Sequence, residues 1–170
     1  MTAPAPRVLL VGVTRSGKSV LGAALAAKTG WPFVDADALV QRATGRTGEQ
    51  LALEEGVAAR HRAESDALTM LLGLPGPYVA ELPIGVLLDA LGQSRLAAAG
   101  ARVVWLRASV PMLARRAGSA LGPQPRLALA QAREETDPVL SELADVVVDV
   151  DLQTPAQLVR TVLRALGEPA

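Results

Sequence analysis

Residues 12–19, with the sequence Gly-Val-Thr-Arg-Ser-Gly-Lys-Ser, match the G-x-x-x-x-G-K-[ST] pattern of loops that enclose the phosphates of ATP or GTP. The glycines let the backbone approach an anion without a Cβ in the way, so successive N–H groups can point at the phosphates. We expect Lys18 to reach the β- and γ-phosphates and the Ser19 hydroxyl to bind a magnesium ion. The pattern predicts nucleotide contacts along the loop and just after it, from Gly12, Thr14, Arg15, Ser16, Gly17, Lys18, Ser19 and Val20.

A second group with chemical potential is the carboxylate pair Asp35 and Asp37, which follows a short apolar run at 33–35. Ligands of open α/β sheets bind at the carboxyl ends of the strands, so the pair is expected near the phosphate loop. Residues two apart on an extended segment project to the same side, where both carboxylates can act on a magnesium ion and a substrate hydroxyl. The alternative is that Asp37 caps a helix beginning at Ala38.

The elements needed to position these groups alternate between strand and helix. The apolar, β-branched run at 7–11 predicts a buried strand before the phosphate loop, and residues 20–28 predict a helix after it. Further strands are predicted at 33–35, 78–82, 102–106 and 146–150, and helices at 36–72 with breaks near 45–48 and 56, near 85–99, at 110–117, from 127, and at 155–166. Repeated units of this kind require an α/β fold with a parallel sheet and helices on both faces. The glycines and prolines in 118–125 predict a mobile loop.

Composition restricts the partners. The 170 residues fit one domain, and 17 Lys and Arg balance 17 Asp and Glu, so no basic field favours nucleic acid or an anionic membrane. Cysteine is absent, which excludes thiolate chemistry and is consistent with a cytoplasmic protein. The N-terminus lacks a signal-peptide pattern, and the most apolar region, 68–91, is interrupted by prolines, so no membrane span is expected. Small molecules are the expected ligands.

The loop 12–19, the pairs 21–22 and 25–26, and the run 30–37 together resemble the opening third of shikimate kinases. Weaker matches continue in the family's order at 44–46, 55–56, 60–64, 103–106, 115–116, 137–138 and 142–145. The resemblance implies a P-loop NTPase three-layer sandwich with strand order 2-3-1-4-5, one domain with a lid at about 118–135, and ATP and Mg²⁺ as cofactors. It assigns magnesium to Asp35 and substrate hydroxyls to Asp37, places Arg116 beside the adenine, and makes Arg126 a lid arginine over the γ-phosphate, where a plain surface arginine is the alternative.

The resemblance weakens where shikimate kinases hold their substrate. A run of three glycines is replaced by Leu-Pro-Ile-Gly at 82–85, and proline has no N–H to donate. The family's first carboxylate-binding arginine corresponds to His61, with Arg60 and Arg62 alongside. The second corresponds to Thr136, and Arg133 lies one helical turn earlier. We therefore expect a complete nucleotide half and a rebuilt acceptor half.

These residues predict a kinase that transfers the γ-phosphate of ATP to a hydroxyl of a small metabolite, with shikimate as the family's default. Lys18, Asp37 and Arg126 are the predicted catalytic residues, and Ser19 and Asp35 the metal ligands. The acceptor is expected to contact Asp37, His61, Arg62 and Glu81, although His61 and Glu81 also fit structural roles, and Glu81 could orient a magnesium-bound water. The alternatives are a nucleotide-binding regulator without transfer activity and a kinase for another acceptor. A monomer or a homodimer is expected.

Overall fold

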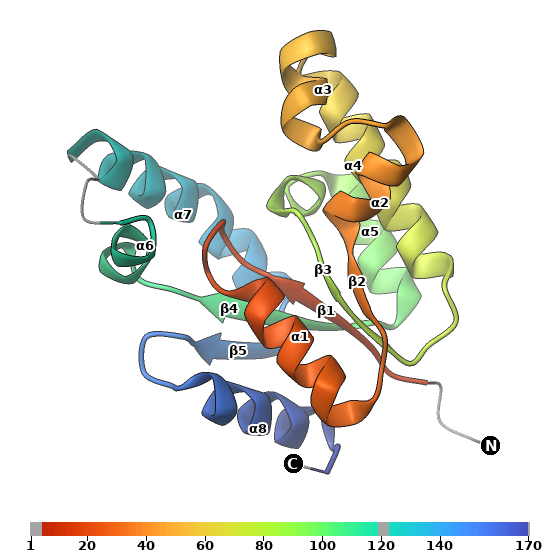
Figure 1. Cartoon of the computed structure of the whole chain (residues 1–170), viewed down its shortest axis with the longest axis vertical. Coiled ribbons are helices and arrows are strands. Elements are labelled where there is room, and N and C mark those ends of the chain that lie inside the picture. The colour runs from red at the N-terminus through yellow and green to blue at the C-terminus, as the bar shows by residue number, and fades with distance from the viewer. Residues whose placement is uncertain (1–4, 119–122, 170) are drawn as a thin grey trace.

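Five short strands form one parallel sheet in the computed structural model, which describes residues 5–118 and 123–169. The strands are β1 (Arg7–Val11), β2 (Phe33–Asp35), β3 (Tyr78–Glu81), β4 (Arg102–Arg107) and β5 (Val146–Asp149). Their order is β2-β3-β1-β4-β5 and every neighbouring pair is parallel, which confirms the predicted topology (Figure 1). β1 lies in the centre, so the loop after it opens at the middle of the sheet's carboxyl edge.

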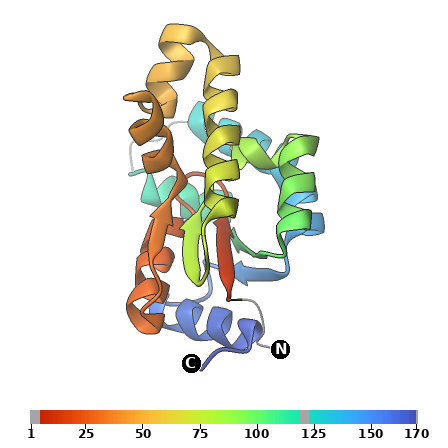
Figure 2. The same ribbon diagram turned by 90° about the vertical axis from the view of Figure 1, so that its right-hand side faces the viewer.

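Helices cover both faces of this sheet (Figures 1 and 2). Helices α1 (Lys18–Thr29) and α8 (Pro155–Leu166) pack on one face, and α4 (Val57–Gly73), α5 (Ala90–Ala99) and α7 (Pro123–Leu143) contribute to the core on the other. The short helices α2 (Ala36–Thr44) and α3 (Gly48–Glu55) pack with α4 beyond the β2 edge, and α6 (Val110–Arg116) follows β4. The three-layer prediction is therefore confirmed.

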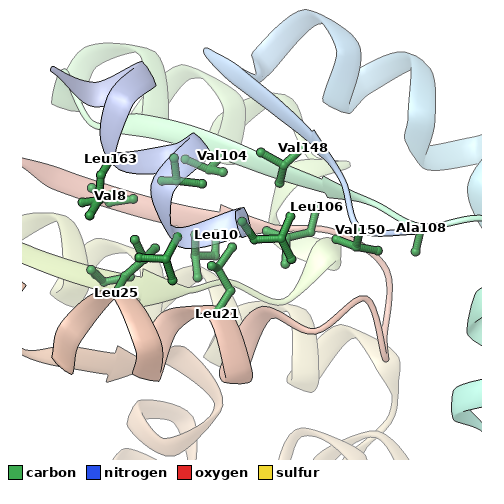
Figure 3. Packing of buried hydrophobic residues seen from close by; sticks show 14 of the residues in the cluster. Val8, Leu10, Leu21, Leu25, Val104, Leu106, Ala108, Val148, Val150 and Leu163 are labelled. Atoms are coloured by element: carbon green, nitrogen blue, oxygen red, sulfur yellow. The ribbon is translucent and has the colours of Figure 1, made fainter. Parts of the chain in front are cut away.

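Two hydrophobic cores lie on opposite faces of the sheet because strand side chains alternate. Val8 and Leu10 of β1 pack with Leu21 and Leu25 of α1 and with α8, as Figure 3 shows. The intervening Leu9 and Val11 enter the second core with residues from α4, α5 and α7. These four side chains of β1 are fully buried. The central strand is thus anchored on both faces, which fixes the origin of the phosphate loop.

The helix boundaries differ from the sequence prediction at two places. The segment after β3 first makes a short 3-10 turn, η1 (Ile84–Leu87), and α5 begins only at Ala90, because the Asp89 side chain caps it by accepting from the N–H groups of Leu91 and Gly92. Helix α7 begins at Pro123 rather than at residue 127. Proline is compatible with the first turn of a helix, where no intrahelical N–H bond is required. Of the predicted mobile loop 118–125, residues 119–122 lie outside the described part of the structure.

Within the described residues, no helix combines the length and the apolar character that crossing a membrane requires.

Candidate active site

The phosphate loop, residues 12–19, connects β1 to α1. Gly12 and Gly17 have φ angles of 148° and 102°, which favour glycine. A Cβ on Gly12 would lie 2.8 Å from both the Leu106 carbonyl oxygen and Ser16 Oγ, so a larger residue does not fit. No side chain caps the N-terminus of α1, which leaves its first N–H groups available to an anion. The loop therefore fits the phosphates of a nucleoside triphosphate.

Lys18 points into this loop. Its Nζ donates to the carbonyl oxygens of Gly12 and Val13, at 2.9 and 3.3 Å. Burial lowers the pKa of Lys18, and the negative charges of Glu81 and Asp37 oppose that shift. The ammonium group therefore lies where phosphate oxygens would replace loop carbonyls as its partners.

Three oxygen-bearing side chains gather at the start of α1. Asp35 and Glu81 are register partners at the ends of β2 and β3, and the Ser19 hydroxyl donates to Glu81 Oε2 at 2.7 Å. Hydroxyl and carboxylate oxygens are the donors that Mg²⁺ prefers, so this set fits the ion. Glu81, predicted from sequence to contact the acceptor or a magnesium-bound water, contacts Ser19 on the metal side.

Asp35 and Asp37 have different local roles. Asp35 is the N-cap of α2, and its Oδ1 accepts from the Asp37 N–H at 2.8 Å. The alternative interpretation of Asp37 as the cap is therefore wrong, because α2 begins at Ala36 rather than Ala38. Asp37 lies in the first helical turn instead of extending the strand, so the argument from strand alternation does not apply to it. The same edge of the sheet nevertheless places both carboxylates beside the phosphate loop.

The electrostatics around Asp37 favour its protonated form. Burial raises the pKa of Asp37, and the negative charges of Asp35 and Glu64 raise it further. The positive charges of Arg60 and Lys18 oppose this rise. Burial likewise raises the pKa of Glu81, and the hydrogen bond from Ser19 opposes this rise. When it is ionised, a carboxylate with a raised pKa accepts a proton more readily than an ordinary carboxylate does. Asp37 is therefore suited to receive the proton of a hydroxyl group.

A cavity of about 450 Å³, here the acceptor pocket, lies between the phosphate loop and α2, α3 and α4. It is lined by Thr14, Asp35, Asp37, Ala38, Gln41, Thr47, Gly48, Glu49 and Arg60. Thr14 belongs to the phosphate loop, so a ligand in this pocket would lie next to the bound phosphates.

A second cavity of about 390 Å³, here the nucleotide pocket, lies on the other side of the loop. It is lined by Arg15, Ser16, Gly17, Lys18, Ser19, Val20, Leu21, Arg116, Pro155 and Leu158. The two pockets meet at the phosphate loop, as donor and acceptor of a phosphoryl group require.

Arg116 holds one wall of the nucleotide pocket. Its Nη1 donates to the carbonyl oxygens of Arg15 and Ser16, at 2.9 and 2.6 Å. Arg15 has a φ angle of 69°, a conformation that costs a non-glycine residue about 1 kcal/mol or more. The C=O and N–H groups of a trans peptide point in opposite directions, so holding Ser16 O turns the Gly17 N–H away from Arg116. Arg116 thus braces the loop as well as lining the predicted adenine site.

Comparison with known proteins identifies the family of this chain. A family model described as shikimate kinase matches residues 15–167. The shikimate kinase of Paramagnetospirillum magneticum is 33% identical over an alignment of 165 positions, which covers 94% of this chain and 83% of that protein. The shikimate kinase of Thermobifida fusca is 31% identical over an alignment of 171 positions including gaps, which covers 96% of this chain and 98% of the relative. The chain belongs to the shikimate kinase family.

Solved structures share the fold of this chain. A shikimate kinase from Acinetobacter baumannii in complex with shikimate has a TM-score of 0.85 at 23% identity and covers 95% of this chain and 93% of its own. A gluconokinase from Sinorhizobium meliloti has a TM-score of 0.65 at 26% identity, covering 96% and 92%. The protein is accordingly an ATP-dependent small-molecule kinase, a phosphotransferase with a hydroxyl acceptor, and its cofactors are ATP and Mg²⁺.

The acceptor side of this family member differs from the predicted set of residues. Arg60, which was predicted only as a neighbour of His61, lines the acceptor pocket, and its Nε donates to Glu64 Oε1 at 2.6 Å. His61 is exposed, and its Nε2 would be 3.9 Å from a Cβ on Gly85. Arg62 lines a different cavity, together with Arg46 and Glu55. A helix turns about 100° per residue, so consecutive positions face in different directions.

Thr136 and Arg133, which the alignment with the family singles out, make contacts within their own helix. Thr136 is buried, and its hydroxyl donates to the Ala132 carbonyl at 2.8 Å. Both Nε and Nη2 of Arg133 donate to Asp137 Oδ2, at 3.0 and 2.6 Å. Arg126 has an exposed side chain on α7, next to the segment that the structure does not describe, so its lid function stays a prediction.

Proposed function

We propose that this kinase phosphorylates a hydroxyl group of a small molecule bound in the acceptor pocket. The observation that carries the proposal is the composition of the pocket wall, where Thr14 of the phosphate loop and Asp37 line one cavity. A hydroxyl bound at Asp37 is therefore adjacent to the site where the γ-phosphate would lie. The length of 170 residues favours a single domain, which we propose to be a monomer or a homodimer. The balanced charge favours a protein that does not bind nucleic acid, and the absence of cysteine is consistent with a cytoplasmic location.

On the donor side, the loop backbone and Lys18 bind the phosphates, and Lys18 exchanges its carbonyl partners for phosphate oxygens. Ser19 and Asp35 would hold Mg²⁺, with Glu81 beside Ser19. The ion neutralises charge on the β- and γ-phosphates when it is bound. Arg116 lines the nucleotide pocket and supports the loop. Arg126 lies on α7, and we assign it the role of stabilising charge on the γ-phosphate.

On the acceptor side, Asp37 orients the hydroxyl and accepts its proton. The oxygen forms a bond to the γ-phosphorus while the bond from that phosphorus to the β,γ-bridging oxygen breaks, and ADP leaves. Arg60 also lines the pocket, whereas His61 lies near Gly85 and is not among the lining residues. Arg62 lies in another cavity and takes no part in this proposal.

A coupled assay of ADP release, run with shikimate and with a panel of other small hydroxylated molecules, tests the proposal. We expect turnover with at least one acceptor and a loss of about a hundredfold or more in Asp37→Asn, because a positioned general base contributes 10²–10⁴-fold. Lys18→Ala should abolish turnover. ATP binding without turnover on any acceptor would contradict the proposal and favour a nucleotide-binding protein without transfer activity.

A further inference from the structure

Two segments that are far apart in the sequence form the wall of the nucleotide pocket beyond the phosphate loop and α1. Pro155 and Leu158 come from the start of α8, and Arg116 comes from the end of α6. Because phosphates bind to the N–H groups of the loop, the base and the ribose would occupy the space between these two helices. The distance between α6 and the start of α8 therefore sets the room for the base.

The start of α8 is positioned by the segment 150–154, which connects β5 to this helix. Val150 is buried, and its N–H donates to a carbonyl oxygen at the end of β4 at 3.0 Å. At the other end of the segment, Thr154 begins α8 with a capping box. The Thr161 hydroxyl donates to Gln153 Oε1 at 2.7 Å. These last two contacts hold the segment to α8 itself and not to α6.

Asp151 connects the same segment to α6. Its Oδ1 accepts from the Ser109 N–H at 3.1 Å, and its Oδ2 accepts from the Ser109 hydroxyl. Ser109 is the N-cap of α6, and its Oγ also accepts from the Met112 N–H at 3.2 Å. Among the hydrogen bonds of the described residues, the two from Ser109 are those that join residues 151–154 to α6. A carboxylate accepts more strongly than a neutral oxygen, so the contact suits a tether.

Helix α6 has other anchors and should keep its place without this contact. It follows β4 through the buried Ala108, and Leu113 is fully buried in the core that contains residues of α1 and α8. Arg116 at its end is bonded to the phosphate loop. By contrast, Leu152 in the segment before α8 is 82% exposed. Loss of the Asp151 contact should therefore release the segment before α8 rather than α6.

We propose that Asp151 is a positioning residue for the nucleotide base, because its bonds to Ser109 hold the start of α8 at the distance from α6 that the base requires. The contact acts on the base and ribose and not on the phosphates, which bind between β1 and α1. If the released segment occupied its present position about a tenth of the time, the apparent affinity for a nucleotide would fall about tenfold. The inference concerns the donor side and does not depend on the identity of the acceptor.

The test compares the Kd of Mg·ATP with the Kd of Mg·tripolyphosphate, which has no base, in the whole chain. Asp151→Ala should weaken the binding of Mg·ATP about tenfold and change the binding of Mg·tripolyphosphate by less than about twofold. A role in stability alone would lower the melting temperature and leave the ratio of the two Kd values unchanged, which would overturn the proposal. Equal weakening of both ligands would also overturn it, because the effect would then lie in α6 and the phosphate loop.

Two further variants separate the contact from the charge. Asp149→Ala is the matched control, because it also removes a carboxylate that accepts two hydrogen bonds, here from Arg107, and lies two residues earlier. Its ratio of Kd values should equal that of the wild type, and a shift as large as in Asp151→Ala would overturn the proposal. Asp151→Asn keeps an oxygen for the Ser109 N–H but loses the charge, so the ratio should shift in the same direction by about threefold. If Asp151→Ala does not fold by its melting curve, an unchanged ratio in Asp151→Asn overturns the proposal.

Discussion

Arg116 joins α6 to the phosphate loop, and its removal is expected to weaken nucleotide binding through the phosphates rather than through the base. The change is Arg116→Ala, which deletes the two hydrogen bonds from Nη1 to the carbonyl oxygens of Arg15 and Ser16. Without these two bonds, the energetic cost of the left-handed backbone at Arg15 is no longer offset by the contact with Arg116. The loop should then populate conformations in which its N–H groups do not converge.

The size of the effect follows from those contacts. A hydrogen bond to a charged group contributes about 1.5–3 kcal/mol when buried. Arg116 is exposed and shares one nitrogen between two carbonyls, so about 1 kcal/mol for each bond is the appropriate value. The sum of about 2 kcal/mol corresponds to a loss of about thirtyfold in affinity.

The assay measures the Kd of Mg·ATP and of Mg·tripolyphosphate, which has no base. Arg116→Ala should weaken both by the same factor, because a brace acts on the phosphate cradle. A loss for ATP with unchanged binding of tripolyphosphate would refute this reasoning and support stacking of Arg116 on the adenine. Arg115→Ala is the control, since the contact of that side chain is with Met112 in its own helix.

Three further predictions follow from the same region. Gly12→Ala should lower the free energy of unfolding by about 1–3 kcal/mol in urea titrations and reduce ATP affinity, because its Cβ would meet Leu106 O and Ser16 Oγ; wild-type behaviour would contradict the described loop. Glu81→Gln should raise the Mg²⁺ concentration for half-maximal binding to the ADP complex by about tenfold. A change in the KM for the acceptor alone would contradict this and indicate that Glu81 contacts the acceptor. The pKa of Asp37 is raised in the folded state, so kcat/KM should increase as pH rises through that pKa, while ionisation reduces stability over the same range. Asp37→Asn should abolish that pH dependence and increase the melting temperature at neutral pH; a decrease would oppose the stated sign.

The sequence is sufficient for features that depend on local pattern. The glycine spacing of the phosphate loop, the apolar runs and the turns predict the parallel sheet, and the short run before Asp35 places that carboxylate at a strand end. These inferences need only residues within one loop or one element. The order of the strands came from the family resemblance, because nothing local to a strand identifies its neighbours.

Contacts between distant segments were not predictable in the same way. Arg116 lies 100 residues after Ser16 in the chain, and Glu81 lies 62 after Ser19. In α4, alignment with the family places the carboxylate-binding arginine at His61, but the residue that lines the pocket is Arg60, one position earlier. One position changes the direction of a helical side chain by about 100°. The pairing of Arg60 with Glu64 follows from the i,i+4 spacing, but the burial of Glu64 against Gly85 depends on how η1 packs.

Helices α2, α3 and α4 enclose a small hydrophobic cluster of their own, formed by Val40, Leu51 and Ala67. It is separate from the two cores that hold β1 and the phosphate loop. Substitutions within this cluster should therefore disturb β1 less than substitutions at Leu68 or Leu71 of α4, which pack in the second core. The outer ends of these helices are accordingly the part of the acceptor side that can change in redesign while the packing behind the phosphate loop is kept.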